Sequence, residues 1–216
     1  DANGYQLEGA MENIKINIHD FIESFIKSLE AKDTYTHGHS IRVAHIACDI
    51  AKNMDLKEKT IQRIHIAGHL HDIGKIGISD KILNKKSKLN NSEYNELKKH
   101  CKIGADFVKN IDILQDVSKI ILSHHEWFNG KGYPNQISKN KIPIESRIIS
   151  VADAFDAMMS HRPYRKPLAF EKVIFELKNN SGKQFDPKII NAFLKILNSK
   201  YIKNYYRKNK YFYKRK

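Results

Sequence analysis

The spacing of the apolar residues is what most limits the fold of this chain. Apolar side chains recur every three or four residues almost throughout, which places them on one face of an α-helix. The first such stripe consists of Ile14, Ile18, Phe21, Ile22, Phe25, Ile26 and Leu29. No segment shows the sustained period-two alternation that is typical of a half-buried strand. The sequence therefore predicts an all-α fold of roughly eight helices.

Short sequence signals place several helix boundaries. Ser92 has the residue type of an N-cap and predicts a helix that continues through His100. Asp186 followed by Pro187 predicts the N-cap and the first residue of the last helix. Further helices are expected over 147–159 and 168–177, and loops over 74–89 and over the glycine- and proline-containing segment 128–143.

The chain carries a formal net charge of +14, and much of the excess lies near its end. That segment contains Lys200, Lys203, Arg207, Lys208, Lys210, Lys214, Arg215 and Lys216. A basic balance suits an anionic partner such as a phosphodiester, a nucleic acid or a membrane surface. A general bias towards Lys, Ile and Asn explains the charge equally well. Interleaved tyrosines would also suit nucleic-acid or anionic-membrane contact, but we favour a solvated end of the last helix.

Two observations bear on the compartment. The two cysteines, Cys48 and Cys101, lie far apart and outside any CxxC motif, so a disulfide framework is not expected. No apolar run approaches the ~20 residues that a membrane span needs. A reducing, cytoplasmic location is therefore predicted.

Histidines and acids occur where apolar helix faces end. The chain has eleven histidines. His71 and Asp72 follow one apolar helical face, and Asp153 sits among apolar residues of another. Buried ionisable groups are costly unless they are paired or bind a metal. Neutral imidazoles and carboxylates suit divalent Mn or Fe, so the ordered set indicates a metal centre: His39, His71, Asp72, His100, His124, His125 and Asp153.

The same residues can serve two metal ions. The two oxygens of Asp72 allow this carboxylate to bridge both ions. His124 and His125 point ~100° apart on a regular helix, so they either flank one ion from different sides or lie where the helix unwinds. A water held between two cations is a hydroxide source at neutral pH.

Two other groups have competing interpretations. His65 and His69 have the i, i+4 spacing of a zinc pair, but no HExxH motif accompanies them and we favour a helix-packing or supporting role. Cys101 follows His100 and could supply a thiolate ligand, but a small apolar filler is favoured.

At these residues the sequence resembles the HD-GYP subgroup of HD-domain phosphohydrolases over about 29–194. The resemblance includes His71-Asp72 followed by Ile-Gly-Lys75, and Gly132-Tyr133-Pro134. It further includes segments 33–43, 100–104, 124–126, 142–147, 151–157, 162–165 and 184–187. It implies an HD-domain helical bundle with additional helices and a GYP loop.

The resemblance also implies roles for single residues. His39, His71, Asp72 and Asp153 would hold one Fe or Mn ion, and Asp72, His100, His124 and His125 the other. Lys75 would act with Asp72 in catalysis by contacting the phosphate. Tyr133, Arg162 and Arg165 would line the substrate site. Glu126 and Asp156 would support the ligands, although an ion pair of Asp156 with Arg147 or Arg162 is the plainer alternative.

The implied function is hydrolysis of cyclic di-GMP to linear pGpG, and in a second round GMP, through a hydroxide activated by two metals. Rival interpretations are a hydrolase of another cyclic dinucleotide or nucleotide, and a non-catalytic signalling module. Some family members bind a third metal through a glutamate at the position of Tyr35, so two metals are predicted here. The position of Cys101 is commonly proline in the family.

The resemblance divides the chain into three parts. Residues 29–197 would form the HD-GYP catalytic domain, 1–28 a linker or helix joined to an upstream sensory or receiver domain, and 198–216 a basic aromatic tail. The chain begins with Asp1 rather than Met, in line with a piece of a longer protein. The oligomeric state, a homodimer included, stays open.

Overall fold

The computed structural model describes residues 38–161 and 166–197. The predicted stripe up to Leu29, Tyr35, Arg162, Arg165 and the basic tail lie outside these residues. The described elements are helices, apart from one isolated bridge between Ser181 and Phe185. The all-α prediction is therefore confirmed.

Eight α-helices of at least eight residues make up most of the described part. They are α3 (His39–Asn53), α4 (Glu58–Leu70), α6 (Asn91–Lys98), α7 (His100–Val108), α8 (Gln115–Ser123), α9 (Ile144–Met159), α10 (Phe170–Asn179) and α11 (Pro187–Leu197). The shorter elements are α5 (Asp80–Leu83) and the 3-10 helices η1 (Ile73–Gly77), η2 (Asp112–Leu114) and η3 (Lys139–Lys141). Within the described ranges, no helix is long and apolar enough to cross a membrane.

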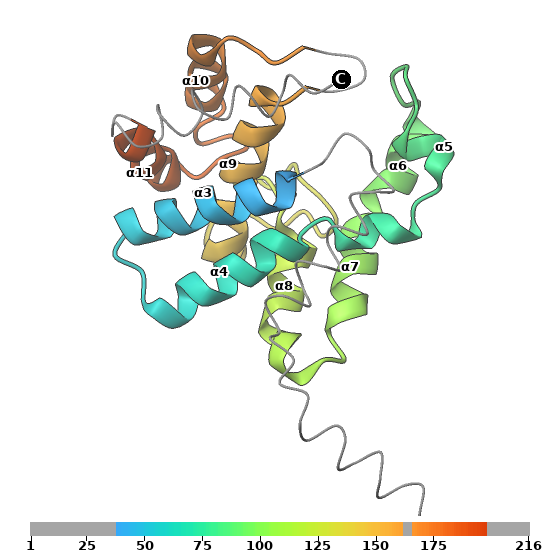
Figure 1. The fold of residues 1–216 in the computed structure, drawn as a ribbon, viewed down its shortest axis with the longest axis horizontal. Helices are drawn as coiled ribbons and strands as arrows, with labels where there is room; N and C mark the ends of the chain where they lie inside the picture. The colour runs from blue at the N-terminus through green and yellow to red at the C-terminus, as the bar shows by residue number, and fades with distance from the viewer. Residues whose placement is uncertain (1–37, 162–165, 198–216) are drawn as a thin grey trace, which may run out of the picture.

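The centre of the bundle is the pair α3 and α4, which lie side by side in Figure 1 and pack on α9. Helices α7 and α8 pack on each other at one end, and α10 and α11 cover the other. Phe155 of α9 is fully buried and meets the ring of Phe193 of α11 edge-on, with 4.9 Å between centroids. Each such side chain contributes about 1.5–3 kcal/mol through burial. This core fixes the directions of the helix ends that carry the polar residues.

Several predicted boundaries shift by a few residues. Ser92 is not the N-cap of α6, because Asn90 takes that role in a capping box with Glu93. The box satisfies two backbone N–H groups at once, which leaves Ser92 inside the first turn. Asp186 does precede the last helix, and its Oδ1 accepts from the Lys188 N–H at 2.8 Å. Helix α9 begins at Ile144, earlier than predicted.

The segment predicted as a loop over 74–89 contains η1 and α5. Gly74 lets η1 lie directly on α7, because a Cβ there would stand 1.9 Å from the His100 carbonyl oxygen and 2.5 Å from the Gly104 nitrogen. No side chain larger than hydrogen fits this contact. The contact brings the chain that follows Asp72 against the start of α7.

Candidate metal centre

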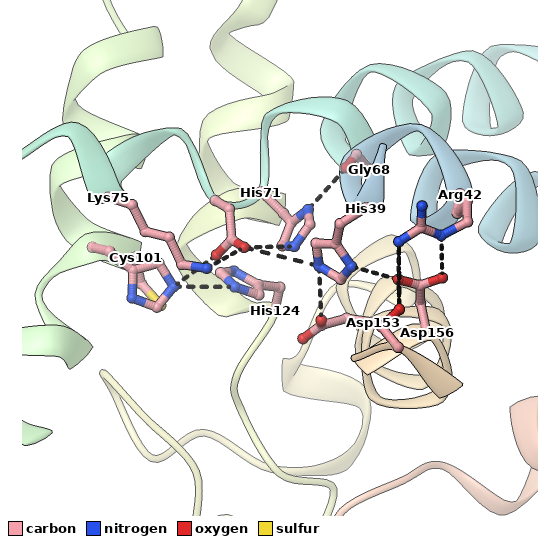
Figure 2. A network of polar contacts seen from close by, with 12 residues as sticks. His39, Arg42, Gly68, His71, Lys75, Cys101, His124, Asp153 and Asp156 are labelled. Atoms are coloured by element: carbon pink, nitrogen blue, oxygen red, sulfur yellow. Dashed lines mark hydrogen bonds and ion pairs between the residues drawn. The ribbon is translucent and has the colours of Figure 1, made fainter. Parts of the chain in front are cut away.

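Helix ends deliver most of the predicted ligands to one place, where Figure 2 shows His39, His71, His124 and Asp153. His39 begins α3, His71 and Asp72 follow the end of α4, and His100 begins α7. His124 and His125 follow the last residue of α8, and Asp153 lies within α9. His124 and His125 therefore lie beyond the regular helix, where two neighbouring residues can face one site. The structure brings all seven residues together.

Asp72 lies between two groups of ligands. Its Oδ2 is 3.9 Å from His39 Nε2 and 3.4 Å from His71 Nε2, and its Oδ1 is 3.6 Å from His100 Nε2. Asp153 Oδ1 is 3.3 Å from His39 Nε2. A carboxylate with one oxygen towards each group has the placement that a bridging ligand needs.

Three of the histidines are oriented by the same kind of hydrogen bond. The Nδ1 atoms of His71, His100 and His124 lie 2.6–2.8 Å from the carbonyl oxygens three residues earlier. A carbonyl only accepts, so each Nδ1 carries the proton and each Nε2 presents a lone pair to the centre. The accepting carbonyls belong to the last turns of α4, α6 and α8, where helices leave carbonyls without intrahelical partners.

His39 is oriented by a carboxylate instead. Its Nδ1 donates to Asp156 Oδ2 at 2.7 Å, and Asp156 is fully buried. Arg42 donates to the same carboxylate through Nε at 2.6 Å and Nη2 at 3.0 Å (Figure 2). The partner of Asp156 is therefore Arg42, whereas Arg147 pairs with Asp186. A carboxylate behind a histidine is the usual support for a metal ligand.

The protonation states of three ligands, Asp72, His124 and His125, suit metal binding. Burial lowers the pKa of His124, and burial together with His100 lowers the pKa of His125 to about 3, so both are neutral at pH 7. Burial acts to raise the pKa of Asp72, but Lys75 and His71 hold it well below its usual range. His39 differs: burial lowers its pKa, but the hydrogen bonds that it donates to Asp153 and Asp156 outweigh this and raise its pKa to about 9.

Two clusters of donor atoms result. Within the described residues, His39, His71 and Asp72 form one, and His100, Cys101, His124 and His125 form the other, with the donor atoms of each within 4.8 Å of one another. His71 Nε2 is buried and has no hydrogen-bond partner in the structure. A buried acceptor aimed at acids and imidazoles is explained by a cation. The clusters can therefore hold metal ions.

The GYP loop lies against this centre. The ring of Tyr133 is 4.9 Å from that of His125. Gly132 lets the loop approach, since a Cβ would stand 2.2 Å from the Trp127 nitrogen. Glu126 accepts from the Asn135 N–H at 2.6 Å. The structure thus places Glu126 as an anchor of the loop, and its predicted support of a ligand stays a prediction.

Lys75 and two residues of α6 complete the surroundings. Lys75 Nζ lies 2.7 Å from Asp72 Oδ2. Tyr94 meets Tyr133 edge-on at 6.4 Å, and Lys98 Nζ lies over both rings, at 4.5 Å from Tyr94 and 5.5 Å from Tyr133. Tyr94 and Lys98 were not predicted, because their i, i+4 spacing shows only a shared helix face.

His65 and His69 belong to neither cluster. Their rings touch edge-on with 4.6 Å between centroids, and His69 is buried. This placement agrees with the helix-packing role favoured from the sequence.

Similarity to known proteins identifies the class of this chain. The family model described as HD domain matches residues 23–189. A cyclic di-GMP phosphodiesterase of Thermotoga maritima is 39% identical over 95% of this chain and 57% of its own length. A 3'3'-cGAMP-specific phosphodiesterase 2 of Vibrio cholerae is 32% identical over 88% of this chain and 38% of its own. A solved cyclic GMP-AMP-specific phosphodiesterase of V. cholerae, V-cGAP3, superposes with a TM-score of 0.65 at 23% identity, over 83% of this chain and 49% of that one.

The chain belongs to the HD domain family. The resemblance to its HD-GYP group, and the HD-domain fold that it implied, are confirmed. The chain spans about half the length, or less, of the curated relatives that it matches.

Proposed function

We propose that this chain hydrolyses a phosphodiester bond of a cyclic dinucleotide, with cyclic di-GMP as the first substrate, by means of two divalent ions, Fe or Mn. The observation that carries the proposal is the placement of Asp72 between two groups of metal-binding side chains. The relative from T. maritima, named a cyclic di-GMP phosphodiesterase, supports the substrate.

The residues divide between the ions as follows: His39, His71, Asp72 and Asp153 hold one, and Asp72, His100, His124 and His125 hold the other. When bound, the pair would supply a hydroxide from water and neutralise the charge of the phosphodiester. The fixed tautomers of His71, His100 and His124 hold the lone pairs in place beforehand, which removes a reorganisation cost from the reaction.

Among the residues that the structure describes, Lys75 is the cation best placed for the phosphate. Its ammonium group rests on Asp72 at 2.7 Å and can turn to a phosphate oxygen once Asp72 binds cations. Tyr133 and Tyr94 offer ring faces for a base, and Lys98 adds a positive charge beside them. We further assign Arg162 and Arg165 to phosphate contacts, because a guanidinium binds phosphate through two parallel hydrogen bonds.

One other substrate has specific support. The V. cholerae relative is named 3'3'-cGAMP-specific, at 32% identity. Both substrates present the same phosphodiesters, so the metal centre does not distinguish them, and the choice between guanine and adenine falls to the residues around Tyr133.

The test is a product analysis with matched variants. The protein is purified anaerobically, its metal content is measured, and cyclic di-GMP and 3'3'-cGAMP are each offered at equal concentration. We expect faster conversion of cyclic di-GMP to pGpG, and then GMP, with loss of metal and turnover in Asp72→Asn and His125→Ala. Asp112→Asn makes the same chemical change at an exposed site and should behave as the unmodified protein.

Three outcomes would contradict parts of the proposal. Full turnover in both site variants would refute the metal scheme. Preference for 3'3'-cGAMP would overturn the substrate. Binding of either dinucleotide by metal-loaded protein without any cleavage would indicate a signalling module rather than an enzyme.

A further inference from the structure

We propose that Cys101 is a metal ligand, and that with His100, His124 and His125 it forms a four-donor site for Zn²⁺ that arrests the catalytic centre. The regulatory half of this statement rests on the proposed function, whereas the zinc site itself does not. The sequence alone favoured Cys101 as a small apolar filler, and the geometry now points to the other interpretation.

Two of the donor distances match those of a tetrahedral ion. Cys101 Sγ lies 3.6 Å from His100 Nε2, and His100 Nε2 lies 3.4 Å from His124 Nε2. With Zn–N near 2.05 Å and Zn–S near 2.3 Å, a tetrahedral angle separates the sulfur from a nitrogen by about 3.6 Å and two nitrogens by about 3.4 Å. The right angles of an octahedral site would bring the two nitrogens to about 3.0 Å.

The donors are fixed before any ion arrives. The Nδ1 atoms of His100 and His124 donate to Leu97 and Ile121 carbonyls, so both Nε2 atoms face the sulfur side of the cluster. Cys101 is fully buried in the first turn of α7. His125 supplies the fourth donor atom within 4.8 Å of the others.

The Cys101 thiol carries a proton that a bound metal ion would have to displace. Binding of Zn²⁺ would form a Zn–S bond and release the thiol proton to solvent.

Cys101 and Asp72 compete for the same histidine. Asp72 Oδ1 and Cys101 Sγ both lie 3.6 Å from His100 Nε2. An ion that prefers oxygen and six ligands would bind Asp72 and leave coordination positions open for water. Zn²⁺ binds more tightly than Mn²⁺ or Fe²⁺ at a given site and favours thiolate, so it would take Cys101. Four protein ligands leave no position for water or substrate.

Cobalt reports the sulfur ligand directly. Metal-free protein is titrated with Co²⁺, and the near-ultraviolet thiolate-to-cobalt absorption is recorded for the unmodified chain, Cys101→Ala and Cys48→Ala. Cys48 is the matched control, since it is also buried but belongs to neither cluster. We expect the band in the unmodified protein and in Cys48→Ala, and its loss in Cys101→Ala. A band of equal strength in Cys101→Ala, or no band in the unmodified protein, would overturn the assignment.

Zinc affinity tests the zinc site itself, and inhibition by zinc tests whether the bound ion arrests catalysis. Competition with a chromophoric chelator should show at least tenfold weaker Zn²⁺ binding in Cys101→Ala than in Cys48→Ala. Inhibition of the Mn-loaded enzyme, normalised to the rate of each variant, should need at least tenfold more Zn²⁺ in Cys101→Ala. Equal inhibition in both variants refutes the arrest by Cys101. A cobalt–thiolate band in a protein that cleaves no cyclic dinucleotide upholds the zinc site and refutes the proposed function.

Discussion

The replacement Asp156→Asn tests whether the residue behind His39 supports the metal centre. The Asp156 carboxylate accepts from His39 Nδ1 at 2.7 Å, from Arg42 at 2.6 and 3.0 Å, and from Ser160 Oγ at 3.1 Å. Burial acts to raise its pKa, but His39 and Arg42 outweigh this and lower it to about 2. Asparagine keeps the shape, loses the charge and turns one acceptor into a donor.

Two effects of different kind should follow. The first is a loss of stability, because Arg42 loses its ion pair with Asp156 at a side chain that is 14% exposed. Removing one partner of such a pair costs about 3 kcal/mol, which lowers Tm by roughly 6–12 °C for a chain of this size. The second is a loss of metal affinity of about 10–100-fold, the usual consequence of removing a carboxylate behind a metal-binding histidine.

The matched control is Asp186→Asn. Asp186 pairs with Arg147 in a similarly buried site, with side-chain exposures of 5% and 13%. Thermal unfolding should show comparable losses in the two variants, whereas calorimetric titration of metal-free protein with Mn²⁺ should show weakened binding in Asp156→Asn alone. Equal Mn²⁺ affinities in the two variants would show that Asp156 only holds Arg42 and would refute its role behind His39.

Two further substitutions have clear expected outcomes. Gly132→Ala should displace the GYP loop, because its Cβ would stand 2.2 Å from the Trp127 nitrogen. Steady-state kinetics should show that this variant raises KM for cyclic di-GMP about tenfold. Lys131→Ala, at the exposed neighbouring position, should leave this KM unchanged. Phe155→Ala should lower the free energy of unfolding, measured with urea, by about 3–5 kcal/mol, since the ring is fully buried. Phe175→Ala, at a side chain that is 64% exposed, should change this free energy by no more than about 0.5 kcal/mol. Unchanged KM in the first, or equal losses in the second pair, would contradict these expectations.

The elements of this fold were predictable because its helices are amphipathic, and their ends were not. The spacing of apolar residues shows which face of a helix is buried, and this burial contributes most of the stability of a helix in a bundle. The N-cap is decided by smaller terms: Asn90 and Ser92 both have suitable side chains, and only the reciprocal bond from Glu93 selects Asn90. That choice is worth about 1 kcal/mol, too little to read from residue type alone.

The site was predictable as a set of residues but not as an arrangement. The ordered set of His39, the pair His71-Asp72, His100, the pair His124-His125 and Asp153 gave the seven candidate ligands. That Asp72 bridges two ions stays a prediction, which its two oxygens allow. The sequence did not reveal that Arg42 rather than Arg147 pairs with Asp156, because residues 114 positions apart meet only through the packing of α3 on α9. Tyr94 and Lys98 were missed for the same reason, since their relation to Tyr133 depends on how α6 meets the loop.

The histidines show how the fold and the site depend on each other. A helix end leaves carbonyls without partners, and an imidazole that serves as a ligand needs an acceptor for its other nitrogen. His71, His100 and His124 meet both needs with one hydrogen bond each, to Gly68, Leu97 and Ile121. The bond stabilises the helix end and fixes the tautomer in the same contact. A cation centre assembled from helix ends therefore uses polar groups that a helical bundle must satisfy in any case.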